Sequence, residues 1–306
     1  MKKKWFAAAL AGTLLAVLLL NGCASAQTAK RLRFGVAGEG GVYHAFGELY
    51  AALENETDNG TVELKTTAGS AANLRLLTGE YLQLAIAQGD LAQDAYDQTG
   101  IFADEEETRG FGAVAALYTE ACQIVVRADA DIQSVEDLQG KTVSIGAEES
   151  GSEQNALQIL AAYGLNDKLV DTVNLNYEDA AAQLKAGKVD AIFITAGAPS
   201  PVLTELAGEC GIRLLNVDGA AAQRLTSAYS AYSAVTLPAG TYPGQDTDVQ
   251  TVGVKAVLLA SDELPAKQVQ KLTELLFSGR EGMEEQLGIP LDAEQDAVEG
   301  VGIPFH

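Results

Sequence analysis

Four short polar turns carry the residue types best suited to hold a small anion. Each contains glycine among polar or small residues and lies between an expected strand and an expected helix: residues 38–43, 67–73, 88–90 and 149–152. Glycine lets the backbone approach a ligand closely, and the first N–H groups of a helix are unpaired and carry the positive end of its dipole. A carboxylate or phosphate can therefore bind at such turns without any arginine.

Each turn taken alone is also typical of an ordinary helix cap, in which Ser70 or Ser152 accepts a bond from its own helix. Four such turns, distributed over two similar halves of the chain, favour a shared anion site. We expect the local dipoles at Gly41, Ser70 and Ser152 to capture the anion, and the cleft to be less acidic than the surface.

The residues needed for enzyme chemistry are scarce. The chain has two histidines, His44 and His306, and no nucleophile-elbow, zinc-protease or P-loop signature. The turn that begins at Gly38 fails the dinucleotide pattern, because Tyr43 stands where the third glycine belongs. His44 fits a histidine at the surface or the cleft edge better than a general base. We therefore expect a protein that is not an enzyme and has no cofactor.

Acidic residues offer one candidate and no metal site. The run at 104–107 is expected to be a solvated loop, and 246–248 lacks the rest of a calcium loop. Glu120 lies in a segment expected to cross between the two halves. It is either a contact for a ligand ammonium group or a carboxylate on the hinge surface.

The first residues have the pattern of an export signal. Three lysines at 2–4 precede an apolar run at 5–20, and small residues follow it. The run is shorter than the roughly 20 residues of a membrane span. We expect residues 1–22 to be a signal peptide of the lipoprotein type that leaves Cys23 lipid-modified, with cleavage after Ala26 as the alternative. Either way the protein is exported, as a membrane-anchored lipoprotein or a periplasmic protein.

Composition limits the partners. The 306 residues include 42 acidic and 20 basic side chains, for a net charge of −22, whereas binding to nucleic acid or to an anionic membrane surface needs a basic patch. We expect neither partner, and membrane attachment only through a lipid anchor. Cys122 and Cys210 have no metal-binding spacing. Two buried thiols are the favoured interpretation, and a disulfide is the alternative.

Short β-branched runs alternate with helix-period segments from residue 31 onward, which is typical of βαβ units. Segments 111–118 and 122–127 are both expected to be strands. We predict two α/β lobes around a central cleft, joined by two extended crossings. Lobe I is expected to hold residues 31–119 and 237–306, and lobe II residues 120–236.

The ordered motifs resemble one family of transport receptors, the TAXI-type solute receptors of tripartite ATP-independent periplasmic (TRAP) transporters. The resemblance covers roughly residues 31–306. It rests on Gly40-Gly41-Val42-Tyr43, Gly69-Ser70-x-x-Asn73-Leu74, Leu84-Ala85-Ile86-Ala87-Gln88, Leu117-Tyr118-x-Glu120, Gly140-Lys141-x-Val143, Ser150-Gly151-Ser152, Gly187-x-Val189-Asp190 and Gly197-x-Pro199.

The resemblance implies a type II periplasmic-binding-protein fold. It also implies that the cleft closes on glutamate, glutamine or a dicarboxylate such as 2-oxoglutarate and delivers it to a sodium-driven TRAP permease. A receptor for an ABC importer and a ligand-sensing subunit remain alternatives, and an enzyme on the same fold is a remote one. The ligand-binding residues that the turns and the resemblance together lead us to expect are Gly41, Tyr43, Ser70, Asn73, Gln88, Glu120, Ser150, Gly151, Ser152, Thr195 and Gly197.

Two features depart from the family pattern. Members often carry a histidine just after the Leu-Tyr-x-Glu segment, where this chain has Cys122-Gln123. Members also usually continue past the position of Phe305-His306, so this chain is either truncated or short by nature.

Overall fold

A ten-stranded mixed sheet organises the protein in the computed structural model, which describes residues 31–57, 61–106 and 108–306. The expected signal peptide at 1–22 and the lipidation candidate Cys23 lie outside the described residues. Residues Leu32–His306 form one compact unit. No helix in the described ranges is long and apolar enough to cross a membrane.

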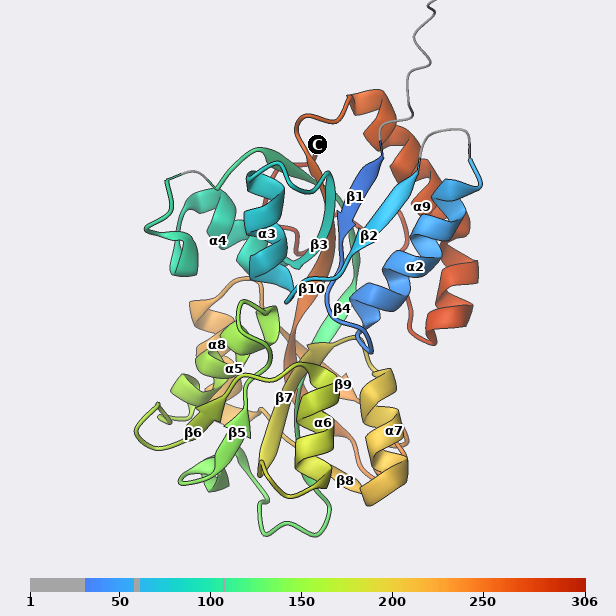
Figure 1. The fold of residues 1–306 in the computed structure, drawn as a ribbon. Helices are drawn as coiled ribbons and strands as arrows, with labels where there is room; N and C mark the ends of the chain where they lie inside the picture. The colour runs from blue at the N-terminus through green and yellow to red at the C-terminus, as the bar shows by residue number, and fades with distance from the viewer. Residues whose placement is uncertain (1–30, 58–60, 107) are drawn as a thin grey trace, which may run out of the picture. The chain divides into compact units, whose positions relative to one another are not determined.

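The elements divide into two α/β lobes (Figure 1). Lobe I holds β1 (Leu32–Gly35), β2 (Val62–Lys65), β3 (Leu84–Gln88), α2 (Val42–Asn55), α3 (Ser70–Thr78), α4 (Gly89–Asp97), the short 3₁₀ helix at Gly100–Phe102, and α9 (Ala266–Leu287). Lobe II holds β5 (Thr142–Ser144), β6 (Asp171–Val173), β7 (Ala191–Ala196), β8 (Ile212–Leu215), β9 (Ser233–Leu237), a 3₁₀ helix at Val135–Leu138, α5 (Gly151–Ala162), α6 (Tyr177–Lys185), α7 (Pro201–Cys210) and α8 (Gly219–Ala228).

Two long strands cross between the lobes, β4 (Phe111–Arg127) and β10 (Val249–Ser261). They pair antiparallel from Phe111 opposite Ser261 to Ala121 opposite Gly253. The strand order is β2-β1-β3-β10-β4-β7-β5-β6, with β8 also on β4 and β9 also on β10. The two predicted lobes and two extended crossings are confirmed.

The sequence interpretation was wrong in two details of this path. The expected strands at 111–118 and 122–127 are one strand, because residues 119–121 keep their pairing to β10 without interruption. Helix α8 was not predicted, since the apolar periodicity of its ten residues is short and rich in alanine.

Helix α2 packs by the face that its apolar spacing predicts. Phe46 and Tyr50 are fully buried, and their stacked rings lie 5.8 Å apart. The Tyr50 hydroxyl donates to the Leu272 carbonyl at 2.8 Å, which ties α2 to α9. A Cβ at Gly279 would lie 2.4 Å from a methyl group of Leu53, so a larger residue at this crossing would have to move the Leu53 side chain.

The cysteines are both free in the structure, so the disulfide alternative is not realised there. Cys122 is buried in the lobe II core, where the Thr195 hydroxyl lies 3.6 Å from its sulfur. Cys210 is half-buried and donates to the Leu206 carbonyl at 3.6 Å.

The last residues pack onto the first crossing strand. Phe305 pairs with Ala113, and the His306 amide donates to the Ala113 carbonyl at 2.9 Å. A Cβ at Gly112 would lie 2.9 Å from the His306 backbone, so glycine allows this close docking.

A smaller side chain in the second crossing strand, β10, tests how much the packing of this strand contributes to stability. Leu258 is fully buried in β10, so Leu258→Ala is expected to lower the free energy of unfolding by about 2–5 kcal/mol in urea titrations. The matched control is Leu157→Ala on α5, where the leucine is 44% exposed and the change should stay within about 0.5 kcal/mol. Equal losses for both variants would contradict the assignment of Leu258 to the core.

Candidate ligand-binding cleft

A cavity of about 250 Å³ lies between the lobes, where strands of both end at helix N-termini. Lobe I contributes the segment before α2, the segment before α3, and Gln88. Lobe II contributes the N-terminus of α5, residues 176–177 and residues 195–196, and Glu120 lies in the crossing strand β4. Nine of the residues expected at a ligand site line this cavity: Gly41, Tyr43, Ser70, Gln88, Glu120, Ser150, Gly151, Ser152 and Thr195.

Two of the expected residues do not line the cavity. Asn73 is completely buried below it, where its amide donates to the Ile86 carbonyl at 2.8 Å and its oxygen accepts from Thr67 at 2.7 Å. These bonds use the side chain to anchor the turn before α3. Gly197 lines a separate hollow near Tyr118, where a Cβ would lie 2.8 Å from Ile289.

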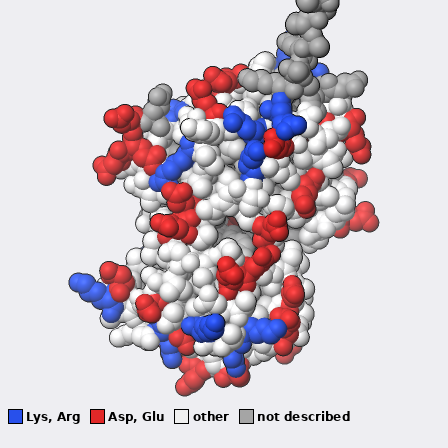
Figure 2. All heavy atoms as spheres, in the orientation of Figure 1, with Lys and Arg blue, Asp and Glu red and all other residues white. Residues whose placement is uncertain are grey.

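The charged residue types at the cavity are all acidic. Two of the described residues that line it are charged, Glu39 and Glu120, and none is lysine, arginine or histidine. Figure 2 shows acidic side chains spread over the visible face, several of them beside the hollow between the lobes. No basic side chain in the described lining offsets them, so attraction for an anion there must come from the helix termini.

Glu120 is buried at the cavity and not on the hinge surface. Its side chain is 2% exposed, and the Tyr43 hydroxyl donates to its Oε2 at 2.7 Å. Burial raises the pKa of Glu120 to about 8 and the nearby Asp90 carboxyl adds to this, while hydrogen bonds from Tyr43 and Gln88 oppose it. Burial also keeps the pKa of Tyr43 well above its ordinary value, so its hydroxyl remains a donor.

The serine hydroxyls mainly hold the turns in place. Ser150 is the N-cap of α5 and accepts from the Glu153 backbone amide at 3.1 Å, whereas the cap interpretation named Ser70 or Ser152. Ser70 and Ser152 are helical residues and not caps. The Ser70 hydroxyl accepts a hydrogen bond from the backbone N–H of Gln88 at 3.1 Å. The Ser152 hydroxyl accepts one from the backbone N–H of Thr195 at 2.9 Å.

Sequence reasoning missed Tyr177 as a cavity residue. Its hydroxyl lies 2.7 Å from the Ser152 hydroxyl and donates to the Thr195 carbonyl at 2.8 Å, which closes a small network on the lobe II side. The sequence could have indicated this position, because Tyr177 directly follows Asn176, the N-cap of α6, and so stands at a turn between a strand and a helix like the four turns singled out above. His44 does not line the cavity, and its Nε2 lies 3.6 Å from an Oε1 of Glu48.

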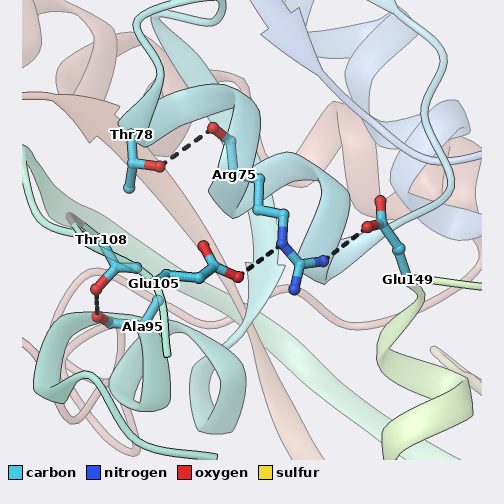
Figure 3. Close-up of polar contacts among 6 residues, drawn as sticks. All are labelled: Arg75, Thr78, Ala95, Glu105, Thr108 and Glu149. Atoms are coloured by element: carbon cyan, nitrogen blue, oxygen red, sulfur yellow. Dashed lines mark hydrogen bonds and ion pairs between the residues drawn. The ribbon is translucent and has the colours of Figure 1, made fainter. Parts of the chain in front are cut away.

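Glu149 of lobe II reaches across and caps helix α3 of lobe I. Its carbonyl accepts from the Ala71 and Ala72 amides at 3.1 and 3.2 Å, two of the donors expected to bind a ligand. Its side chain forms an ion pair with Arg75 at 2.8 Å, and Arg75 also pairs with Glu105 at 2.9 Å (Figure 3). Glu149 has a φ of 63°, a left-handed conformation uncommon for a non-glycine residue.

A second bridge between the lobes joins Asn155 of α5 to Asp90 of α4. The Asn155 amide donates to an Oδ2 of Asp90 at 3.1 Å and to the Tyr232 hydroxyl at 2.7 Å. Burial raises the pKa of Asp90 to about 6 although its hydrogen bonds oppose this. The two lobes are therefore held together by the Glu149 contact with α3 and by the Asn155–Asp90 hydrogen bond.

Comparison with known proteins gives the family. The profile described as the NMT1-like family matches residues 34–306. The chain belongs to the NMT1-like family.

Solved structures show the fold of this NMT1-like chain. The periplasmic binding protein BugD has a TM-score of 0.60 at 14% identity, covering 89% of this chain and 92% of its own. PhnD1 of Prochlorococcus marinus, in complex with methylphosphonate, has a TM-score of 0.56 at 13% identity. The match covers 85% of this chain and 89% of the PhnD1 chain. The alkanesulfonate-binding protein SsuA of Xanthomonas axonopodis pv. citri, bound to MOPS, has a TM-score of 0.52 at 18% identity. The match covers 87% of this chain and 82% of the SsuA chain. The predicted type II periplasmic-binding-protein fold is confirmed.

A bulky residue at Gly151 should weaken the contact between the lobes. A Cβ there would lie 2.1 Å from the buried Gln88 amide oxygen, so Gly151→Val must displace Gln88 or the α5 terminus. Hydrogen-exchange mass spectrometry is expected to show about tenfold faster exchange at Ala71 and Ala72, whose amides bond Glu149.

The matched control is Gly208→Val on α7, where a Cβ would have no neighbour within 4 Å. Its exchange at Ala71 and Ala72 should equal that of the unmodified protein. Unchanged exchange in both variants would contradict the closed contact.

Proposed function

We propose that this protein is an extracytoplasmic solute receptor that encloses a small carboxylate ligand between its lobes and delivers it to a sodium-driven TRAP permease. The observation that carries the proposal is the cavity of about 250 Å³ between the lobes, which is lined by the N-terminal turns of α2, α3 and α5. The first turns of helices such as α2 and α5 offer N–H groups and a favourable dipole to an anion, whereas the Ala71 and Ala72 amides of α3 already bond the Glu149 carbonyl. The ligand leaves unchanged, because the role of the site is capture and release.

The ligand-binding residues of this proposal are those that line the cavity, with Asn73 as a support for the turn before α3. The family and the fold support a receptor. PhnD1, a similar fold, is described in complex with methylphosphonate, an anion. The ordered motifs of the TAXI-type receptors support glutamate, glutamine or a dicarboxylate as ligand and a TRAP permease as partner.

The proposal includes the lobe boundaries and the cellular location. Lobe I holds residues 31–119 and 237–306 and lobe II residues 120–236, so the first boundary falls within the crossing strand β4, and the second falls at the last residue of β9, ahead of the crossing strand β10. A boundary inside a paired strand fits bending of the crossings as the lobes open and close. The receptor works outside the cytoplasmic membrane, anchored through lipidated Cys23 or free in the periplasm.

A thermal-shift screen of amino, keto and dicarboxylic acids tests ligand binding. Saturation at 100 times the dissociation constant adds about 2.7 kcal/mol. For a chain of this size the melting temperature should rise by about 5–10 °C with the cognate ligand. Gly208→Val, altered far from the cavity, should show the same shift. No shift with any of these acids would contradict the proposal.

The choice of permease is tested in membrane vesicles that carry a TRAP permease from the source organism. The ligand-loaded receptor is expected to support uptake only under an inward sodium gradient. Uptake that needs ATP and ignores sodium would contradict the TRAP partner while leaving the receptor function intact.

A further inference from the structure

The floor of the cavity holds a buried carboxyl group with no positive partner among the residues that line it. Glu120 is 2% exposed, and its bonded neighbours are the neutral Tyr43 hydroxyl and Gln88 amide. The charged residues lining the cavity are Glu39 and Glu120, both acidic. A buried carboxylate is costly unless it is paired with a cation.

The opposite wall has limited room for anions. The Glu149 carbonyl already occupies the Ala71 and Ala72 amides of α3, so fewer helix-terminal donors face the ligand than the sequence suggested. A second ligand carboxylate would have to approach Glu39 or Glu120 without a cationic side chain to neutralise it. The lining therefore suits one anionic group at the helix termini and one cationic group at the floor.

We propose that the ligand carries a protonated amine that binds the Glu120 carboxylate, so that the cleft selects amino acids over dicarboxylic acids that lack an amine. This inference rests on the proposed receptor function and narrows its ligand class. Tyr43 positions the carboxylate through its hydrogen bond, and Gln88 holds it from the lobe I side. The ligand carboxylate lies at the helix termini.

Binding of this kind is linked to a proton. With a pKa of about 8, the Glu120 carboxyl is mostly protonated at pH 7 in the empty cleft, and an ammonium group favours its ionised form. Ligand binding should therefore release about 0.9 proton per site at pH 7. The affinity for an amino acid should rise about 50-fold between pH 6 and pH 8, as the proton that competes with the ligand is lost.

Other titratable groups around Glu120 leave the proton release at pH 7 readable, although Asp90 also titrates at the acidic end of the pH 6 to 8 range. They are Tyr43 of α2, Asp90 of α4, Tyr118 and Cys122 of β4, and Tyr177 of α6. Burial raises the pKa of each tyrosine and brings that of Cys122 to about 12, so these groups stay neutral near pH 7. The Asp90 carboxyl, with a pKa of about 6, is mostly ionised there.

Matched ligand pairs measured by calorimetry test the inference on the unmodified protein. L-glutamate is compared with 2-oxoglutarate and glutarate, and L-glutamine is added as a singly acidic amino acid. At pH 7, in two buffers of different ionisation enthalpy, an amino acid is expected to bind with release of about 0.9 proton. The two acids without an amine should bind at least about 100-fold more weakly.

The Glu120→Gln variant tests whether Glu120 is the group that binds the ligand amine and releases the proton. This variant should bind the amino acid about 100-fold more weakly, and its binding heat should no longer depend on the buffer. Glu48→Gln is the matched control, because it removes an exposed carboxyl on α2 outside the cavity and should leave the proton release unchanged. If Glu120→Gln does not fold, the ligand pairs still decide.

The outcomes separate the two proposals. Two results would overturn the role of Glu120 and leave the receptor function standing. One is tight binding of 2-oxoglutarate or glutarate together with no binding of the amino acids. The other is amino-acid binding without proton release. Failure of all these acids to bind would count against both.

Discussion

The antiparallel pairing of β4 with β10 is the constraint on which both lobes depend. Each strand pairs with strands of both lobes or spans the junction between them, and their register places Glu120 opposite Val254. A Cβ at Gly253 would lie 2.5 Å from the Glu120 carbonyl, so the strands approach closely because this position is glycine. The same pairing that joins the lobes therefore fixes the carboxyl group at the cavity floor, and the site is part of the scaffold.

Helix termini serve two purposes in this arrangement. The α3 terminus donates to the Glu149 carbonyl of the other lobe, so its dipole helps to hold the lobes together as well as to attract an anion. The Arg75–Glu149 ion pair beside it is partly exposed and contributes about 0–1 kcal/mol. The backbone contact is more shielded, and closure depends chiefly on it and on the Asp90–Asn155 bond.

The sequence predicted the positions of the site better than the roles of its side chains. Turns between strands and helices lie at one edge of parallel strands whatever the packing, so the turns that hold Gly41, Gln88 and Gly151 were predicted from the pattern. Whether a polar side chain faces the cavity or the core depends on neighbours from distant segments, as with Asn73, whose partners come from β1 and β3. The burial of Glu120 could not be predicted for the same reason, because Tyr43 and Gln88 come from two other elements.

Native mass spectrometry of the purified protein, followed by denaturing extraction, tests the central claim most directly. We expect one small molecule bound per folded chain, released on denaturation, and carrying both a carboxylate and an amine. A bare chain mass that persists after incubation with the amino, keto and dicarboxylic acids would contradict the account of an enclosed ligand site.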